Sequence, residues 1–123
     1  MKHSKFRFED LTIWKEAIHI GMLLFDIADE LELNKLWRFA DQTRGVGMSI
    51  SNNICESTGT QMIREQQQFL RYARRECYEA ANILTLLEMR NFITSETKAE
   101  LYQQLHVLSR RIQAYSYSLD RRL

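Results

Sequence analysis

The 123-residue chain contains no proline and only four glycines. Turn-rich β-sandwiches and β-barrels use both residues heavily, so their scarcity argues against an all-β fold and favours long helices. There are two cysteines, Cys55 and Cys77, and because their spacing forms no paired motif we expect each to be a small buried hydrophobic residue. The longest unbroken apolar run, Ile20–Phe25, is far shorter than the roughly 20 residues of a membrane-spanning helix.

The net charge of the chain is close to zero. Seventeen Lys and Arg residues against sixteen Asp and Glu residues give +1 at pH 7, so no strong overall field indicates a nucleic-acid or membrane partner. With 45% hydrophobic and 27% charged residues, we expect one soluble globular domain over residues 1–123. The N-terminus is basic and no apolar secretory stretch follows it, which favours a cytoplasmic protein with a flexible tail over about residues 1–8.

Apolar residues recur at helical spacing in four segments, and the short stretches between them hold the Asn, Gly, Ser and Thr residues that interrupt helices. We expect helices over about residues 10–31, 36–57 and 64–91, and a fourth after a link at residues 92–95. Helices joined by short links lie antiparallel to their sequence neighbours. The sequence therefore predicts an all-α, antiparallel up-down-up-down four-helix bundle.

Capping residues are expected at the helix starts. Asp10 is placed to accept hydrogen bonds from the free amides of the first helix, and Asn34 is a candidate for the second. For the fourth helix, Thr94 or Ser95 fits as well as a capping box that begins at Thr97.

The first two predicted helices have unusual surfaces. The first carries two overlapping apolar stripes, namely Leu11, Trp14, Ile18, Met22, Phe25 and Ile13, Ala17, Ile20, Leu24, Ile27, Leu31. An apolar face this wide predicts contact with more than one neighbour, and a subunit interface is one explanation. The second helix is rich in poor helix formers, namely Gly45, Gly47, Ser49, Ser51, Asn52 and Asn53. We therefore expect tertiary contacts at a close helix crossing, inside an assembly, to hold the second helix.

No catalytic or metal-binding motif is complete. Glu16 and His19 have the Glu-x-x-His spacing that di-iron carboxylate sites take from a helix, but Gln103 stands at the matching offset before His106. Nothing in the sequence brings a histidine to either cysteine, and no phosphate-cradling loop or dinucleotide fingerprint is present. We expect no catalytic residue, no metal, no cofactor and no enzymatic activity.

The remaining chemical signal is the placement of arginine. Twelve of the seventeen cations are arginine, and residues 63–123 carry ten basic and seven acidic side chains. The candidate nucleic-acid contacts are Arg64, Arg71, Arg74 and Arg75 on the third helix and Arg110 and Arg111 on the fourth. A guanidinium suits phosphate and carboxylate alike. Two interpretations stay open: contact with RNA or DNA, or pairing with Glu76, Glu79 and acidic groups of neighbouring subunits.

Five tyrosines would stack on unpaired bases if they were exposed beside these arginines, namely Tyr72, Tyr78, Tyr102, Tyr115 and Tyr117. Aromatic residues at helical spacing are more often core or interface residues, and Tyr115 falls on an apolar stripe. We therefore assign no tyrosine to base stacking from the sequence.

Two stretches follow a family pattern. Phe8–Ala17 fits a start of the form Phe-x-Asp-Leu-x-Val-Trp-x-x-Ala, and seven further residues match a second motif, namely Gln42, Arg44, Ser49, Ile50, Asn53, Ile54 and Glu56. On these residues, with Phe69, Leu70, Ala73 and Glu79 of the third helix, the chain resembles the 23S rRNA intervening-sequence protein family along nearly its whole length. It departs from the family at Ser51, where a proline is usual, and at Thr60, where an arginine is usual.

The resemblance implies a four-helix bundle, commonly a ring-shaped homopentamer, from a family encoded in part within insertions in bacterial 23S rRNA genes, with no enzymatic activity. We expect a non-enzymatic oligomer that binds RNA or another nucleic acid weakly through its arginines. The alternative is a protein-interaction scaffold without nucleic-acid contact. We expect structural or interface roles for Trp14, Arg44, Ser49, Asn53 and Glu56, with Asn53 and Glu56 satisfying buried polar groups at a helix crossing or subunit seam.

Overall fold

The computed structural model describes residues 5–123, and all regular secondary structure in this part of the chain is helical. The four main helices are α1 (Thr12–Leu33), α2 (Trp37–Ser57), α3 (Ile63–Met89) and α4 (Ser95–Ser118). Short 3-10 helices precede and follow them, η1 at Arg7–Asp10 and η2 at Leu119–Arg122. These boundaries lie within about two residues of those expected from the apolar periodicity, and the all-α class is confirmed.

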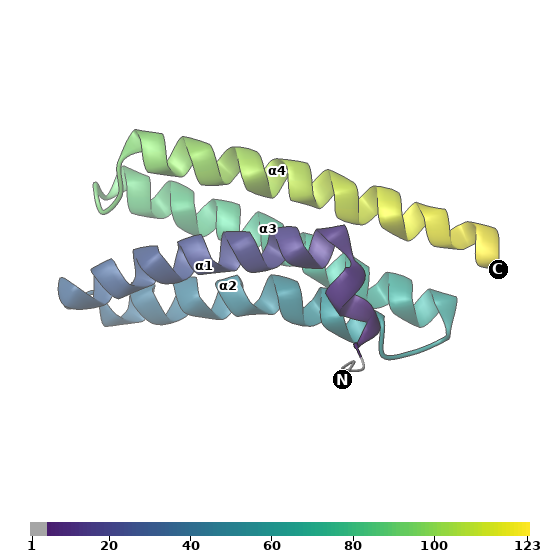
Figure 1. Cartoon of the computed structure of the whole chain (residues 1–123). Helices are drawn as coiled ribbons and strands as arrows, with labels where there is room; N and C mark the ends of the chain where they lie inside the picture. Colours follow the sequence, from purple (N-terminus) through teal and green to yellow (C-terminus); the bar gives the residue numbers. More distant parts are fainter. Residues whose placement is uncertain (1–4) are drawn as a thin grey trace.

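The helices run up and down side by side (Figure 1). Each helix packs against the next one in the chain, and α4 returns to contact α1, which closes the bundle. The first turns of α3 and the last turns of α4 extend beyond the start of α1 (Figure 1). The expected antiparallel four-helix bundle is confirmed, and at this extended end Gln67 of α3 is hydrogen-bonded to Ser116 of α4.

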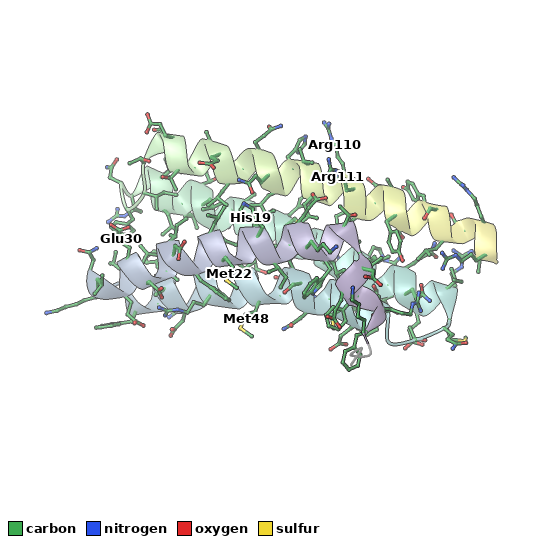
Figure 2. The ribbon with its side chains drawn as sticks, in the orientation of Figure 1. His19, Met22, Glu30, Met48, Arg110 and Arg111 are labelled. Atoms are coloured by element: carbon green, nitrogen blue, oxygen red, sulfur yellow. The ribbon has the colours of Figure 1, made fainter. Side chains whose placement is uncertain are left out.

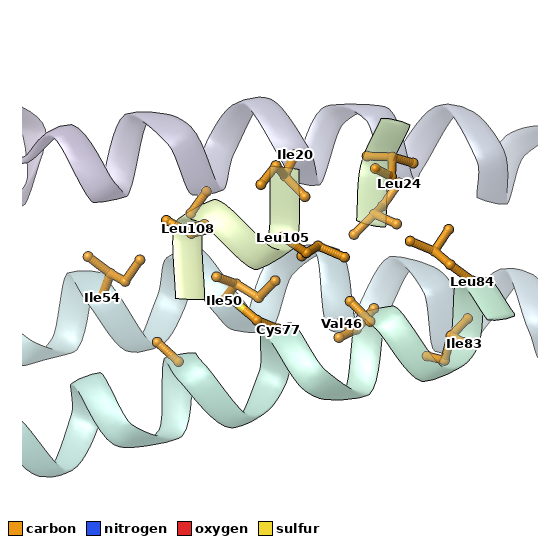
Figure 3. Packing of buried hydrophobic residues seen from close by; sticks show 14 of the residues in the cluster. Ile20, Leu24, Val46, Ile50, Ile54, Cys77, Ile83, Leu84, Leu105 and Leu108 are labelled. Atoms are coloured by element: carbon orange, nitrogen blue, oxygen red, sulfur yellow. The ribbon is translucent and has the colours of Figure 1, made fainter. Parts of the chain in front are cut away.

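The core is an apolar column along the axis of the bundle (Figure 3). Its fully buried side chains include Ile20, Leu24, Ile50, Ile54, Leu84, Leu87, Leu105, Leu108 and Ile112. Of the two stripes on α1, the one that begins at Ile13 faces this core and is buried except at Ile27, which is half-buried. The other stripe is half-buried or exposed, and Met22 is 56% exposed. One stripe is therefore enough for the single chain, and the other is left at the surface.

Helices α1 and α2 approach each other closely at two glycines. A Cβ atom on Gly21 would lie 2.7 Å from the carbonyl oxygen of Gly47, and one on Gly47 would lie 3.4 Å from the oxygen of Gly21. Real Cβ contacts are not as short as the first distance, so any side chain at Gly21 forces the two backbones apart. Of the small residues of α2, Gly47 therefore serves the close helix crossing that was expected, although Gly21 was not recognised as its partner from the sequence.

The start of α1 differs from the expectation. Asp10 does not cap α1, because residues 7–10 turn as η1 and place Leu11 at the N-cap, where no side chain accepts a capping bond. The Phe6 amide instead donates to Glu9 Oε2 (2.8 Å) at the start of η1. Of the tail expected to be flexible, residues 1–4 lie outside the described residues, and the rest leads into η1 or forms part of it.

Two of the three links between helices begin with the same turn. After α1 and after α3 the chain passes through a residue of positive φ, Lys35 (62°) and Asn91 (61°), and the next amide donates back to the helix, from Leu36 to Leu31 and from Phe92 to Leu87. This is the Schellman pattern of helix ends. Asn34 therefore closes α1 and does not begin α2, which corrects its expected role.

The sequence did not decide which residue is the N-cap of α4, and the structure does. The Thr97 amide donates to Thr94 Oγ1 (3.1 Å), so Thr94 is the N-cap.

Replacement of Gly21 by alanine tests the close crossing. We expect Gly21→Ala to lower the free energy of unfolding by about 1–3 kcal/mol, because the new methyl group overpacks against the α2 backbone. Gly45 also lies in α2, but a Cβ there meets no atom within 4 Å, so Gly45→Ala is the matched control and raises stability by up to about 1 kcal/mol through helix propensity. Urea denaturation measures both, and equal stability of the two variants would contradict the crossing.

Candidate nucleic-acid interface

Helix α3 presents a ridge of arginines to solvent. Arg64, Arg71 and Arg75 are spaced by seven and four residues, which places them on one face of the helix, and all three are exposed. Arg74 is half-buried and turns toward α4. Of the four arginines that the sequence singled out on α3, three thus share one exposed face, and Arg74 lies toward α4.

Arg74 is held in place by α4 and by its own helix. Its Nε donates to Ser109 Oγ (3.3 Å), and its Nη2 donates to the hydroxyl of Tyr78 (3.4 Å). Its guanidinium carbon lies 5.6 Å from the centre of the Tyr78 ring, within the range of a cation–π contact. These partners are neutral, so the positive charge of Arg74 stays available to an anion.

Arg64 belongs to a network of polar side chains that joins the start of α3 to the end of α4 and to η2. Gln67 is buried, and its Nε2 donates to the Ser116 carbonyl oxygen (2.9 Å) and to Asp120 Oδ1 (2.8 Å). Arg64 Nη1 donates to Gln67 Oε1 (2.9 Å) and lies 3.4 Å from Asp120. This network connects the first turns of α3 to the end of α4. Sequence reasoning missed Gln67, although it stands three residues before Leu70 and so continues the apolar stripe.

The two candidate arginines of α4 differ in their surroundings (Figure 2). Arg111 forms an ion pair with Glu16 of α1, so it lies on the α1 side of α4 and does not join the α3 arginines. Arg110 is exposed. In the part of the chain that the structure describes, no ion pair within 4.0 Å involves Arg71, Arg74, Arg75 or Arg110. Within the single chain, pairing of these arginines with Glu76 or Glu79 is therefore not observed.

Charge is divided unevenly between the helices. Helix α1 has one lysine against five carboxylates, namely Glu16, Asp26, Asp29, Glu30 and Glu32. Residues 101–119 in α4 and at the start of η2 include no Asp or Glu. Helix α3 itself is balanced, with four arginines against Glu65, Glu76, Glu79 and Glu88, so the positive character near α4 comes from the placement of the arginines and from the acid-free stretch of α4.

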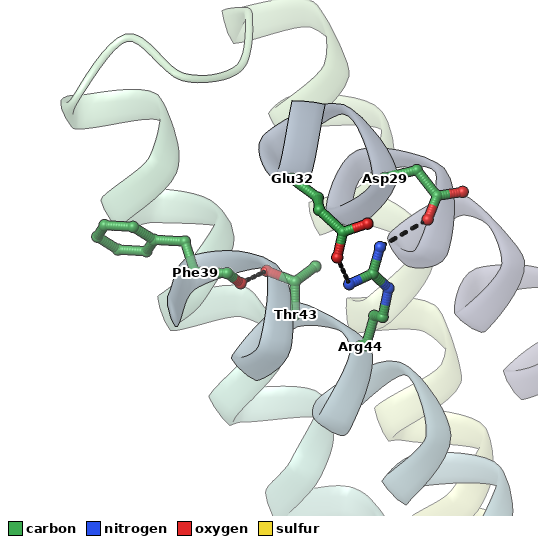
Figure 4. A network of polar contacts seen from close by, with 5 residues as sticks. All are labelled: Asp29, Glu32, Phe39, Thr43 and Arg44. Carbon is green, nitrogen blue, oxygen red and sulfur yellow. Dashed lines mark hydrogen bonds and ion pairs between the residues drawn. The ribbon is translucent and has the colours of Figure 1, made fainter. Parts of the chain in front are cut away.

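Arg44 connects α2 to α1 (Figure 4). Its Nη2 donates to Asp29 Oδ1 (2.8 Å) and its Nη1 to Glu32 Oε1 (3.0 Å). These two hydrogen bonds, with that to Asp29 the larger effect, raise the pKa of the Arg44 guanidinium. Arg44 thus neutralises carboxylates that gather near the C-terminal end of α1, where the helix dipole disfavours negative charge.

The other residues expected to be structural differ from one another. Trp14 is half-buried, and its ring centre lies 4.9 Å from that of Phe8 in η1. Asn53 Nδ2 donates to the Ser49 carbonyl oxygen (2.9 Å) of its own helix, and Glu56 is exposed. Within the described residues, Asn53 makes this one hydrogen bond inside α2 and none to another helix, so the role expected for Asn53 and Glu56 at a subunit seam stays a prediction.

Ser49 instead faces a carboxylate of α3. Partial burial raises the pKa of Glu76, and a hydrogen bond and repulsion from Glu79 raise it further, whereas a hydrogen bond with Ser49 opposes the shift. This pair was not identified from the sequence, because Ser49 and Glu76 are 27 positions apart and only the packing of α2 on α3 brings them together.

The groups that could support catalysis or metal binding lie apart. Burial raises the pKa of Cys77 to about 12, so its thiol is not an activated nucleophile. Glu16 of the Glu-x-x-His pair is engaged by Arg111. Among residues 5–123, no three His, Cys, Asp or Glu side chains gather as metal ligands would, and none of the helices there is long and apolar enough to cross a membrane.

The fold and this surface define a class: an antiparallel four-helix bundle whose third helix exposes arginines along the groove to the fourth. The chain belongs to the 23S rRNA-intervening sequence protein family, whose model matches residues 9–114. The resemblance noted in the sequence is thereby confirmed. No curated protein sequence matches the chain.

A solved structure shares the fold. It is the crystal structure of a protein with unknown function from the S23 ribosomal protein family of Bacteroides thetaiotaomicron VPI-5482. It superposes with a TM-score of 0.81 at 19% sequence identity, over 85% of this chain and 98% of that chain. At this identity the likeness establishes the bundle fold alone.

The raised pKa of Glu76 predicts a pH-dependent cost in stability. Because the folded state holds the Glu76 proton more tightly than the unfolded state, stability falls as the pH rises through the window between the unfolded and the folded pKa. We expect Glu76→Gln to be more stable than the parent at pH 7 and equal to it near pH 3, where both side chains are neutral. Ser49→Ala should lower stability at pH 7, since it removes the opposing hydrogen bond. Thermal unfolding at the two pH values measures this, and a Glu76→Gln variant destabilised equally at both would be inconsistent with it.

Proposed function

We propose that this protein is a non-enzymatic oligomer that binds nucleic acid through the arginines of α3. The observation that carries the proposal is that Arg71 and Arg75 are exposed, next to Arg74, without a carboxylate partner among the described residues. The neighbouring stretch of α4 contributes the exposed Arg110 and no acidic side chain. The family's description, which names the intervening sequence of 23S rRNA, is compatible with an RNA ligand.

The α3 arginines would bind nucleic acid through its phosphate groups, and this kind of contact determines how binding depends on salt and on sequence. Arginine donates two parallel hydrogen bonds to a phosphate, and each neutralised phosphate releases condensed counterions, so binding weakens steeply as salt rises. Such contacts do not distinguish one base sequence from another, because the phosphate backbone is the same for every sequence. We therefore expect salt-sensitive binding with little sequence preference.

Self-association is the second part of the proposal, and an apolar surface on α1 and α2 supports it. Met22 and Met48 are 56% and 52% exposed (Figure 2), and they flank a hollow of about 160 Å³ together with Ile18 and Phe25. Contiguous exposed apolar surface of this kind marks interaction sites. A second copy of the chain, as in the homopentamer implied by the family, would cover the surface and repeat the arginines in every subunit. Several linked copies bind one long ligand more tightly than a single copy does.

The nucleic-acid part is tested by removing charge. We expect the combined change Arg71→Gln, Arg74→Gln and Arg75→Gln to weaken binding of labelled structured RNA and single-stranded DNA, and to reduce the slope of log affinity against log salt by about two to three, one for each lost phosphate contact. Titrations at about 50 and 200 mM salt measure the slope.

The matched control removes the same charge elsewhere. Arg7, Arg38 and Arg90 are also exposed but lie outside this surface, so the combined Arg7→Gln, Arg38→Gln and Arg90→Gln variant should keep the parent's slope. An equal loss in both triple variants would show that net charge, and not the α3 surface, governs binding.

The self-association is tested at the apolar surface. We expect the parent to be an oligomer by light scattering, and Met22→Lys with Met48→Lys to shift it toward the monomer while the helical circular dichroism persists. Met89, which is 71% exposed at the end of α3, provides the control, since Met89→Lys should leave the oligomer intact. A parent that is monomeric would overturn self-association and leave the α1–α2 surface to the alternative function, a scaffold for another protein.

A further inference from the structure

The groove between α3 and α4 carries three exposed tyrosines. Tyr78, Tyr102 and Tyr117 are 62%, 45% and 63% exposed, whereas Tyr115 packs partly against the core. Tyr78 projects from α3 and the other two from α4. An exposed tyrosine loses the stabilisation that burial would give its ring. Within the chain, the Tyr117 hydroxyl accepts a hydrogen bond from Gln113 Nε2 (2.8 Å), while much of the ring stays open to solvent.

Each of these tyrosines lies beside a cation. The Arg74 guanidinium lies 5.6 Å from the centre of the Tyr78 ring, and Lys98 Nζ lies 4.3 Å from that of Tyr102. Tyr117 lines one hollow together with Arg71 and Arg74. From the sequence, base stacking requires tyrosines that are exposed beside arginines. Tyr78 and Tyr117 meet this requirement in the fold, and Tyr102 lies beside a lysine instead.

Two hollows follow one another along this groove. One, of about 90 Å³, is bordered by Tyr78 and Tyr102, and the other, of about 320 Å³, has the apolar side chains of Leu70 and Ile112 in its lining. Arg74 stands between them, since it lines the second hollow and contacts Tyr78 of the first. The lining of the two hollows thus combines apolar side chains, tyrosine rings and the guanidinium groups of Arg71 and Arg74.

We infer that the α3–α4 groove binds single-stranded nucleic acid, with bases stacked on Tyr78, Tyr102 and Tyr117 and phosphates held by Arg71 and Arg74. The inference rests on the nucleic-acid binding proposed above and adds to it the class of ligand. Sites for single strands combine a positive groove with aromatic side chains on which bases stack. In a duplex the base faces are stacked on one another and do not reach the tyrosines.

The dimensions of the groove agree with a short single strand. From Tyr102 to Tyr117 α4 rises by about 22 Å at 1.5 Å per residue, a length that about four to six nucleotides cover. The contacts involve base faces and phosphates, and none depends on the sugar. RNA and DNA strands of the same sequence should therefore bind with affinities within a few-fold of one another.

Fluorescence anisotropy with labelled RNA, DNA and duplex DNA of about 12 nucleotides tests the inference. We expect the parent to bind both single strands at least tenfold more tightly than the duplex. Tyr78→Ala and Tyr117→Ala should each weaken single-strand binding about tenfold, as for the loss of one stacked base, and leave duplex binding unchanged. Tyr78→Phe and Tyr117→Phe keep the ring and should retain binding. Circular dichroism checks that the exposed truncations leave the bundle folded.

Tyr72 is the matched control. It also lies on α3 and is 37% exposed, but it contacts Phe69 and Gln68 and lines neither hollow, so Tyr72→Ala should bind like the parent. Equal affinity for strand and duplex, with tyrosine variants like the parent while the arginine triple variant still loses binding, would overturn the stacking and leave the proposed function standing. If the parent binds no nucleic acid at low salt, both fall.

Discussion

The close approach of α1 and α2 at Gly21 and Gly47 is the constraint on which this bundle depends. Because the two backbones nearly touch, α2 stays helical although its sequence is rich in glycine, serine and asparagine, which are poor helix formers. At that level the side chains of Leu24 and Phe25 pack around Gly47, whereas Met22 and Met48, which follow the two glycines in their helices, lie at the surface. The apolar surface at Met22 and Met48 therefore lies directly beside the contact of Gly21 with Gly47.

The seam between α3 and α4 has the opposite character. Gln67 and Arg74 reach across it to Ser116, Asp120 and Ser109, and long polar side chains take the place of a close backbone contact. Such a seam leaves hollows between the helices, and their exposed rims are formed by tyrosines and arginines. The surface beside the glycine contact of α1 and α2 is therefore apolar. The surface along the polar contacts of α3 and α4 presents positive charge and tyrosine rings.

Much of the fold could be predicted from the sequence, because the apolar stripes repeat at helical spacing and locate the four helices. Which of the two stripes of α1 faces the core is decided only by the packing. The caps at Asp10 and Asn34 could not, since they depend on where the backbone leaves the helix: η1 displaces Asp10, and the turn through Lys35 assigns Asn34 to α1. The α3 arginines were found by spacing. The engagement of Arg111 with Glu16, and the contact of Ser49 with Glu76, require the packing of separate helices.

The two proposed surfaces have to be compatible in one assembly. A closed ring of an odd number of copies joins two different patches of the chain at every contact, so the α1–α2 surface must meet some other part of the next copy. If that part were the α3–α4 groove, the α1 carboxylates would compete with phosphate for its arginines. Arg44 already engages Asp29 and Glu32, two of the carboxylates nearest the C-terminal end of α1. This internal pairing weakens the attraction of α1 for a neighbour's arginines and favours an assembly in which the groove stays open to its ligand.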